Sequence, residues 1–175
     1  MYKIIALFIA TASLFGCATP ATQQAMIINK SDIKITEDQK TKLKGTVEVV
    51  SVTGGKETNP LWTSQVDSKT FKGALEDSLT LVGYKSQDKN PKFKIDANLL
   101  ELDQPLFGLT LSVKSHVNYT VNYENKSQVI PIRATGEATP SDAFIAIERL
   151  RIANERAISE NIKSFIIKFT ETFAN

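Results

Sequence analysis

Few residues of this sequence combine the types and the spacing that catalysis or metal binding needs. His116 is the only histidine, and Asp96, Glu101 and Asp103 are carboxylates crowded on one predicted strand. A catalytic acid–base pair needs its groups held within hydrogen-bond reach in a prepared site, and a zinc site of the usual kind needs further histidine or cysteine ligands. We therefore expect no catalytic residues, no metal and no cofactor, and a protein that is not an enzyme.

The only cysteine, Cys17, ends a short apolar run near the N-terminus. Lys3 precedes this run, which extends from Ile4 to Phe15 and ends at the small Gly16. Its length is typical of a signal peptide, because a membrane-spanning helix needs roughly 20 apolar residues. The sequence Leu14-Phe15-Gly16-Cys17 resembles the lipobox of bacterial lipoproteins, in which the cysteine is acylated and becomes the first residue. Phe15 departs from the usual small residue, which leaves a secreted or uncleaved form as the alternative.

The lipobox resemblance implies a location and a first partner. Residues 1–16 would be the signal peptide, and several acyl chains, palmitate among them, would hold Cys17 in a membrane, because one chain alone binds only weakly. Ala18, in place of an aspartate, implies the bacterial outer membrane with the protein facing the periplasm. The net charge of +2 argues against a nucleic-acid partner. A protein of the cell envelope is the expected second partner, and any small-molecule ligand is unknown.

The residues after Cys17 divide into a polar stretch and a patterned region. Residues 17–43 are rich in Thr, Gln, Lys and Asp, which predicts a tether with a span of roughly 28 Å if it is flexible. Ile33–Thr36 is an alternative edge strand within it. Residues 44–175 are long enough for one well-buried core and are expected to form a single domain.

The hydrophobic pattern of residues 44–175 predicts the element order β-α-β-β-β-α. The second predicted strand changes phase near Leu99, which indicates a bulge, and odd residues from Phe107 to Tyr123 alternate with polar ones, which indicates a strand with one buried face. The fold class is then α+β: a two-layer sandwich with a four-stranded, mainly antiparallel sheet and two helices on one face. The expected strands are 45–53, 92–102, 107–123 and 129–138, and the expected helices are 68–83 and 144–173, the second capped within 139–142.

The loops suggest where a partner binds. If the first two strands are parallel, the loops that carry Leu61, Trp62, Leu106 and Phe144 meet at one pole of the sheet. Clustered apolar loop residues indicate an interaction surface, and the alternative is a cap over the end of the core. With the tether entering at the opposite pole, this surface would face away from the membrane.

Polar residues of the last predicted helix have two interpretations each. Asn154 and Asn161 lie on or beside its apolar stripe, where they mark either the rim of the helix or a specific polar contact. Arg149, Arg156 and Lys163 share a ridge that is either a solvated face or a site for an anionic head group.

Four stretches carry a family resemblance. They are VTGGKETNPLWTSQV, FKGALEDSLTLVGY, LDQPLFGL and ERLRIANERAISENI, and they resemble a family of small uncharacterised Gram-negative lipoproteins over about residues 48 to 170. The architecture is also similar to YajG-like lipoproteins and to the lipoprotein partner of the lipopolysaccharide translocon. Some relatives are labelled UDP-N-acetylglucosamine acyltransferase, but such enzymes resemble β-helices with hexapeptide repeats, and this sequence has no six-residue repeat.

Three functions follow as expectations. The first is a non-catalytic, lipid-anchored interaction or accessory module of an envelope assembly or transport complex. The second is a lipid-binding or lipid-transfer lipoprotein, which would need a continuous apolar cavity lined by Phe71, Leu111 and Phe165. An enzyme of acyltransferase type is the third.

Overall fold

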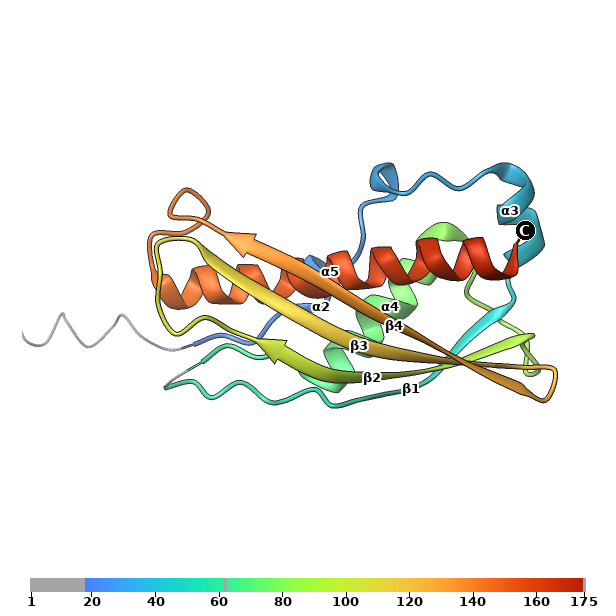
Figure 1. Ribbon diagram of the computed structural model, residues 1–175, viewed down its shortest axis with the longest axis horizontal. Helices are drawn as coiled ribbons and strands as arrows, with labels where there is room; N and C mark the ends of the chain where they lie inside the picture. The colour runs from blue at the N-terminus through green and yellow to red at the C-terminus, as the bar shows by residue number, and fades with distance from the viewer. Residues whose placement is uncertain (1–17, 62, 175) are drawn as a thin grey trace, which may run out of the picture.

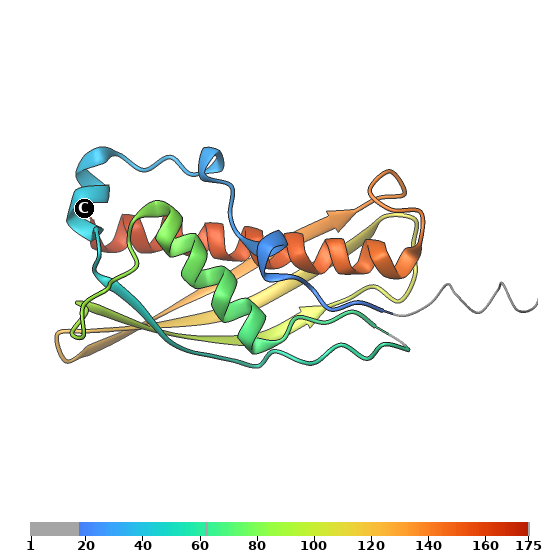
Figure 2. The same ribbon diagram turned by 180° about the vertical axis from the view of Figure 1, so that it is seen from behind.

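The computed structural model describes residues 18–61 and 63–174, and these form the predicted α+β sandwich (Figure 1). One sheet has the strand order β1-β2-β3-β4, with β1 and β2 parallel and the other neighbours antiparallel. Two helices, α4 and α5, cover one face of the sheet and leave the other face open, as the two opposite views show (Figures 1 and 2). The main elements are β1 (Val47–Thr53), α4 (Ser68–Val82), β2 (Phe93–Asp103), β3 (Leu111–Tyr123), β4 (Lys126–Ala138) and α5 (Ala146–Phe173).

Helix α4 begins and ends where local chemistry places its boundaries. The carboxylate of Asp67 accepts a hydrogen bond from the backbone N–H of Thr70 and caps the first turn. Gly83 ends the helix in the left-handed conformation, with φ of 83°. Phe71, Leu75 and the other residues at helical spacing are buried against the sheet.

Strand β3 confirms the predicted alternation but begins later than predicted. Its odd residues from Leu111 to Val121 are buried, and the residues between them are at least partly exposed. Phe107 and Leu109 were expected on the same buried face, yet both are highly exposed because the strand starts only at Leu111. The predicted bulge in β2 is confirmed, since the pairing register with β3 shifts between Leu99 and Glu101.

The turn between β3 and β4 and the start of α5 both differ in position from the prediction. Glu124 and Asn125 form a two-residue hairpin turn, and both have the positive φ that such a turn needs, so β4 begins at Lys126 rather than at 129. Helix α5 starts at Ala146 rather than at 144, and no side chain caps it. The cap was expected within 139–142, but the carboxylate of Asp142 accepts the backbone N–H of Thr139 and a hydrogen bond from Arg156 instead.

The prediction of a flexible tether is wrong for residues 18–43, which pack along the helical layer and are called the N-terminal segment below. Met26 lies in α2 (Gln23–Met26), which contacts both α4 and α5 (Figure 2). The segment continues through the short helix η2 (Lys30–Asp32) and α3 (Glu37–Leu43), and 33–36 form no strand. Its apolar residues leave water by packing against the two long helices, which no tether would do. Those buried in the core are Ala21, Met26, Ile28 and Leu43.

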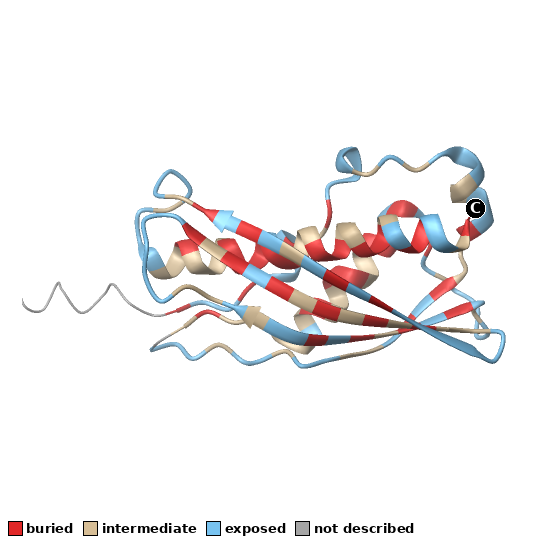
Figure 3. Ribbon diagram, viewed as in Figure 1, coloured by how far each residue is buried: buried red, intermediate tan, exposed pale blue. Residues whose placement is uncertain are grey.

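The core between the sheet and the helices is closely packed with aromatic rings. The ring of Tyr119 stacks on that of Phe165 with centroids 3.9 Å apart, and Phe93 meets Phe169 edge to face at 5.2 Å. Buried and exposed residues alternate along the strands, as Figure 3 shows.

Within 18–61 and 63–174, no helix is long and apolar enough to cross a membrane.

Candidate functional site

Three loops meet at one end of the sheet because of the strand directions. Strands β1 and β2 are parallel, and β4 runs in the same direction because β3 is antiparallel to both of its neighbours. The chain segments that follow these strands therefore leave at the same end, which is the left end in Figure 1. The described parts of these loops are 54–61 with 63–67, 104–110, and 139–145.

The tips of these loops expose large apolar side chains, and we call this surface the apolar pole. Leu106 is 91% exposed, Phe107 is 86% exposed and Phe144 is 93% exposed. A groove of about 410 Å³ runs between the 104–110 loop and the first turns of α5, with Leu106, Phe107 and Leu150 in its wall. The apolar pole consists of Leu61, Leu106, Phe107, Leu109, Phe144 and Ile145.

A polar cluster beneath the apolar pole holds two of its loops together. The side-chain amide of Gln104 donates to the carbonyl of Ser64 and to Asn154 Oδ1, both at 2.8 Å. Its Oε1 accepts from the hydroxyl of Thr63 at 2.9 Å, and Asn154 also donates to the carbonyl of Ser64. Since Asn154 is fully buried in α5, these bonds fix the bases of both loops to a rigid helix.

The third loop is fixed by arginines of α5. Arg149 is buried, and its Nη1 donates to the carbonyls of Ala143 and Phe144 at 3.0 and 2.7 Å. Arg156 donates to Asp142 at 2.7 Å, which lowers the pKa of that carboxyl below its usual range. Two members of the predicted arginine–lysine ridge are therefore engaged within the fold, and the third, Lys163, pairs with Glu160.

The described chain begins at the apolar pole. Ala18 donates its backbone N–H to the carbonyl of Pro60 at 2.7 Å, and Ala21 donates to the carbonyl of Gln65. The dark blue start of the chain lies at the same end as the three loops in Figures 1 and 2. The expectation that the chain enters at the opposite pole is therefore wrong, and the reason is that the N-terminal segment packs along the full helical layer before β1 begins.

The structure brings three of the four predicted partner-binding residues to this pole. Leu61, Leu106 and Phe144 are all exposed there. Trp62 and the predicted lipidation site Cys17 lie outside the described residues. Sequence reasoning missed Phe107 and Leu109 because they continue the alternation of β3; the Pro and Gly residues around them were the signal of a loop.

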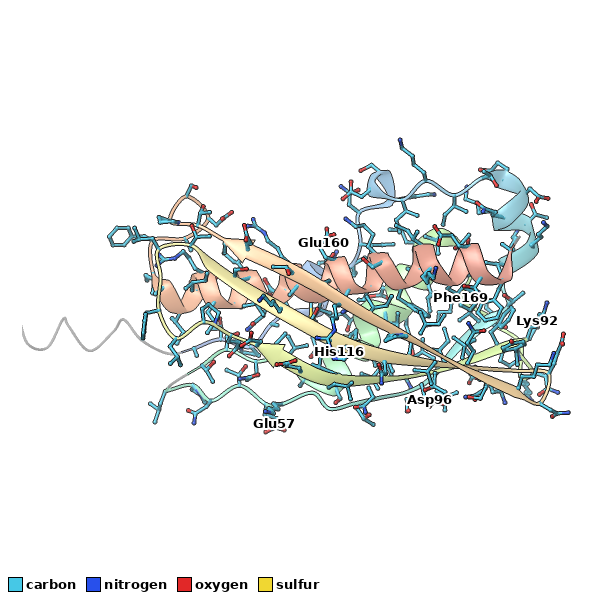
Figure 4. The ribbon with its side chains drawn as sticks, viewed as in Figure 1. Glu57, Lys92, Asp96, His116, Glu160 and Phe169 are labelled. Atoms are coloured by element: carbon cyan, nitrogen blue, oxygen red, sulfur yellow. The ribbon has the colours of Figure 1, made fainter. Side chains whose placement is uncertain are left out.

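The open face of the sheet gathers the residues that had been considered for acid–base chemistry. His116 lies opposite Glu101 on β2 and opposite Arg133 on β4, above a depression of about 330 Å³, and Figure 4 shows His116 on this face. No hydrogen bond or ion pair joins these three side chains in the described structure. Asp96 binds the hydroxyl of Ser51 at 2.6 Å. The described residues hold no group of three or more His, Cys, Asp or Glu that could bind a metal ion.

Asn161 lies in the core and not at a rim. Its Oδ1 accepts the hydroxyl of Tyr119 at 2.9 Å, and its amide donates to Ser115 Oγ and to the carbonyl of Ile132. Asn154 is likewise buried in the cluster beneath the apolar pole. For both residues the interpretation as a specific polar contact is correct, because a buried amide must find hydrogen-bond partners. Burial of Tyr119 raises the pKa of its hydroxyl well above 10.0.

Comparison with known proteins finds structural likeness without sequence likeness. No protein-family model matches the sequence, and no curated protein matches it. A solved structure of a DUF330-family protein from Xanthomonas campestris is similar with a TM-score of 0.52 at 8% identity, covering 75% of this chain and 86% of that one. A proposed lipoprotein from Caulobacter crescentus is similar with a TM-score of 0.51 at 13% identity, covering 78% of this chain and 96% of that one. At these identities the likeness shows a shared fold.

Proposed function

We propose that this protein is a lipid-anchored lipoprotein of the bacterial cell envelope. It acts as a non-catalytic accessory module of an assembly or transport complex, attached to the outer membrane and facing the periplasm. The observation that carries the proposal is the lipobox-like Leu14-Phe15-Gly16-Cys17 directly before Ala18, which is hydrogen-bonded to the domain. The fold shared with the proposed Caulobacter lipoprotein supports it.

The packed N-terminal segment supports a role as a fixed module. Because Ala18 and Ala21 are both held by backbone hydrogen bonds, the domain has little freedom relative to an anchor at Cys17. A partner in the same membrane would then meet the domain at a defined height and orientation. Such a fixed placement reduces the entropy that binding costs.

The packing of the core argues against the lipid-carrier alternative. Phe71 and Phe165 were expected to line a continuous cavity, but both are fully buried, and the ring of Phe165 stacks on Tyr119. Side chains therefore occupy this part of the interior, which has no room for an acyl chain without repacking.

The acyltransferase-type alternative has a different difficulty. The described residues form an α+β sandwich, and the fold is not the β-helix that the labelled enzymes resemble. His116 is the residue on which an acid–base mechanism would depend, so it supplies the control for the test of the function.

The test is the Cys17→Ser variant of the full chain, expressed in a Gram-negative host. Wild type is expected to be cleaved before Cys17 and to carry the mass of several acyl chains, and the variant is expected to stay unprocessed because the diacylglyceryl group is attached through sulfur. Intact-mass spectrometry checks both. A variant with the wild-type mass in the membrane fraction would contradict the anchor.

The accessory role is tested with the same proteins. Affinity purification of the acylated protein from its native membrane should recover envelope proteins that the Cys17→Ser variant does not, and the matched His116→Ala variant should recover the same proteins as wild type. A His116→Ala variant that has an unchanged melting temperature but fails to restore any envelope phenotype of a deletion strain would contradict the non-catalytic role.

A further inference from the structure

We infer that the apolar pole docks on the phospholipid bilayer that holds the anchor. Leu61, Leu106 and Phe144 then contact lipid rather than the protein partner expected for them. The inference rests on the proposed acylation of Cys17 and adds the orientation of the domain and the surface that touches the membrane.

The residue that follows the proposed attachment point is bound next to this pole. Ala18 is hydrogen-bonded to Pro60, and Pro60 directly precedes the exposed Leu61. Neighbouring Cα atoms are about 3.8 Å apart, so an acylated Cys17 keeps its glyceryl group close to the 54–61 loop. That group must sit at the surface of the hydrocarbon layer, and the apolar pole must therefore lie at the same surface.

The side chains of the pole suit this surface. Residues 104–110 contain no ionisable side chain, and within 139–145 the only one is Asp142, which is bound to Arg156. Leu106, Phe107 and Phe144 project as exposed apolar side chains from loop tips. The free energy falls when such side chains enter the boundary between head groups and acyl chains. They therefore add a second attachment to that of the acyl chains.

The pole is also prepared for docking before it meets lipid. The hydrogen bonds of Gln104 with Ser64 and Asn154, and those of Arg149 with Ala143 and Phe144, fix the bases of the loops. Fixed loops lose little conformational entropy on insertion. A cap over the core would instead bury these side chains, whereas Leu106 and Phe144 are more than 90% exposed.

This orientation decides which surfaces a protein partner can reach. The β3–β4 hairpin and α3 lie at the far end of the long axis from the apolar pole (Figure 1). With the pole on the membrane, this far end and the open face of the sheet remain in the periplasm.

The experiment places a fluorescent NBD label at single new cysteines in the full acylated protein. Acylation blocks the thiol of Cys17, the only native cysteine, so each new cysteine is the only site for the label. The labelled variants are Leu106→Cys and Phe144→Cys at the pole, with Ser127→Cys at the exposed start of β4 as the matched control. Each protein is reconstituted in vesicles of phosphatidylethanolamine and phosphatidylglycerol with and without doxyl-labelled lipid. A fourth protein carries Phe107→Ser and Leu109→Ser with the label at Phe144→Cys.

We expect doxyl lipid to quench the labels at 106 and 144 and to leave the label at 127 bright. The two serine substitutions should reduce the quenching at 144. Equal quenching at the pole and at 127, with acylation shown by intact mass, would overturn the inference and leave the proposed function standing. Labels at the pole that are shielded from iodide in native membranes but unquenched in lipid vesicles would also overturn it, in favour of a protein partner. An unacylated Cys17 would overturn both proposals.

Discussion

Single polar residues in the core show how burial constrains this fold at the residue scale. Asn161 on α5 joins Tyr119 and Ser115 of β3 to the carbonyl of Ile132 on β4 through hydrogen bonds of 2.9 to 3.2 Å. All these groups are shielded from water, and the Tyr119 hydroxyl has Asn161 as its hydrogen-bond partner. A network of this kind fixes the position of a helix along a sheet, because sliding would leave several buried groups unpaired.

The substitution Asn161→Leu tests this network. It keeps a similar volume but leaves the Tyr119 hydroxyl without a partner, so we expect a loss of about 1–3 kcal/mol in the free energy of unfolding. Chemical denaturation measures it. The double variant Asn161→Leu with Tyr119→Phe should lose less than the sum of the single variants, and strict additivity would show that the two side chains are not coupled.

At the scale of elements, the contact between α5 and β4 depends on small residues. A Cβ atom on Gly136 of β4 would lie 2.1 Å from the backbone N of Ala157 and 2.4 Å from the carbonyl oxygen of Ala153. Ala153 and Ala157 are themselves fully buried. The backbone of the helix therefore rests directly on the strand, and this close approach sets the distance between the two layers near the apolar pole.

The substitution Gly136→Ala should push α5 away from β4. We expect a loss of about 1–3 kcal/mol in the free energy of unfolding, which is typical of overpacking a well-filled interior. Urea denaturation gives the value. Thr135→Ala, one residue earlier on the exposed side of the strand, is the control and should change stability little; equal losses in both variants would contradict the close contact.

At the scale of the whole molecule, the N-terminal segment connects the apolar pole to the far end of the domain. Glu155 of α5 is buried, and its carboxylate accepts the backbone N–H of Thr22 at 2.8 Å and a hydrogen bond from Arg151 at 2.6 Å. At the far end Lys42 donates to the carbonyl of Ala174 at 2.9 Å. The start of the chain therefore stays at the pole because it is bound to the long helix.

The substitution Glu155→Ala should release the start of this segment. It removes the acceptor of the Thr22 N–H, so we expect faster hydrogen–deuterium exchange over residues 18–28 with the sheet unchanged. The matched control is Glu160→Ala, which removes only the surface pair with Lys163. Unchanged exchange at 18–28 in Glu155→Ala would show that apolar packing alone holds the segment.

The sequence by itself determined the two-layer fold, the buried face of β3, the bulge near Leu99 and the end of α4 at Gly83. Each of these is reported by local periodicity or by a residue with a special backbone preference, because alternation and helical spacing record which side of an element is buried. The convergence of the Leu61, Leu106 and Phe144 loops also followed, since it depends only on strand direction.

Only the tertiary structure decided the placement of the N-terminal segment and of the buried amides. Met26 and Ile28 stand in a polar, aperiodic stretch, and nothing local shows that two helices far along the chain offer them a surface. The partners of Gln104 and Asn154 are likewise distant in sequence. Such contacts are made between elements, so a pattern within one element carries no record of them. For this reason the sequence indicated an apolar pole but placed the start of the described chain at the opposite end of the sheet.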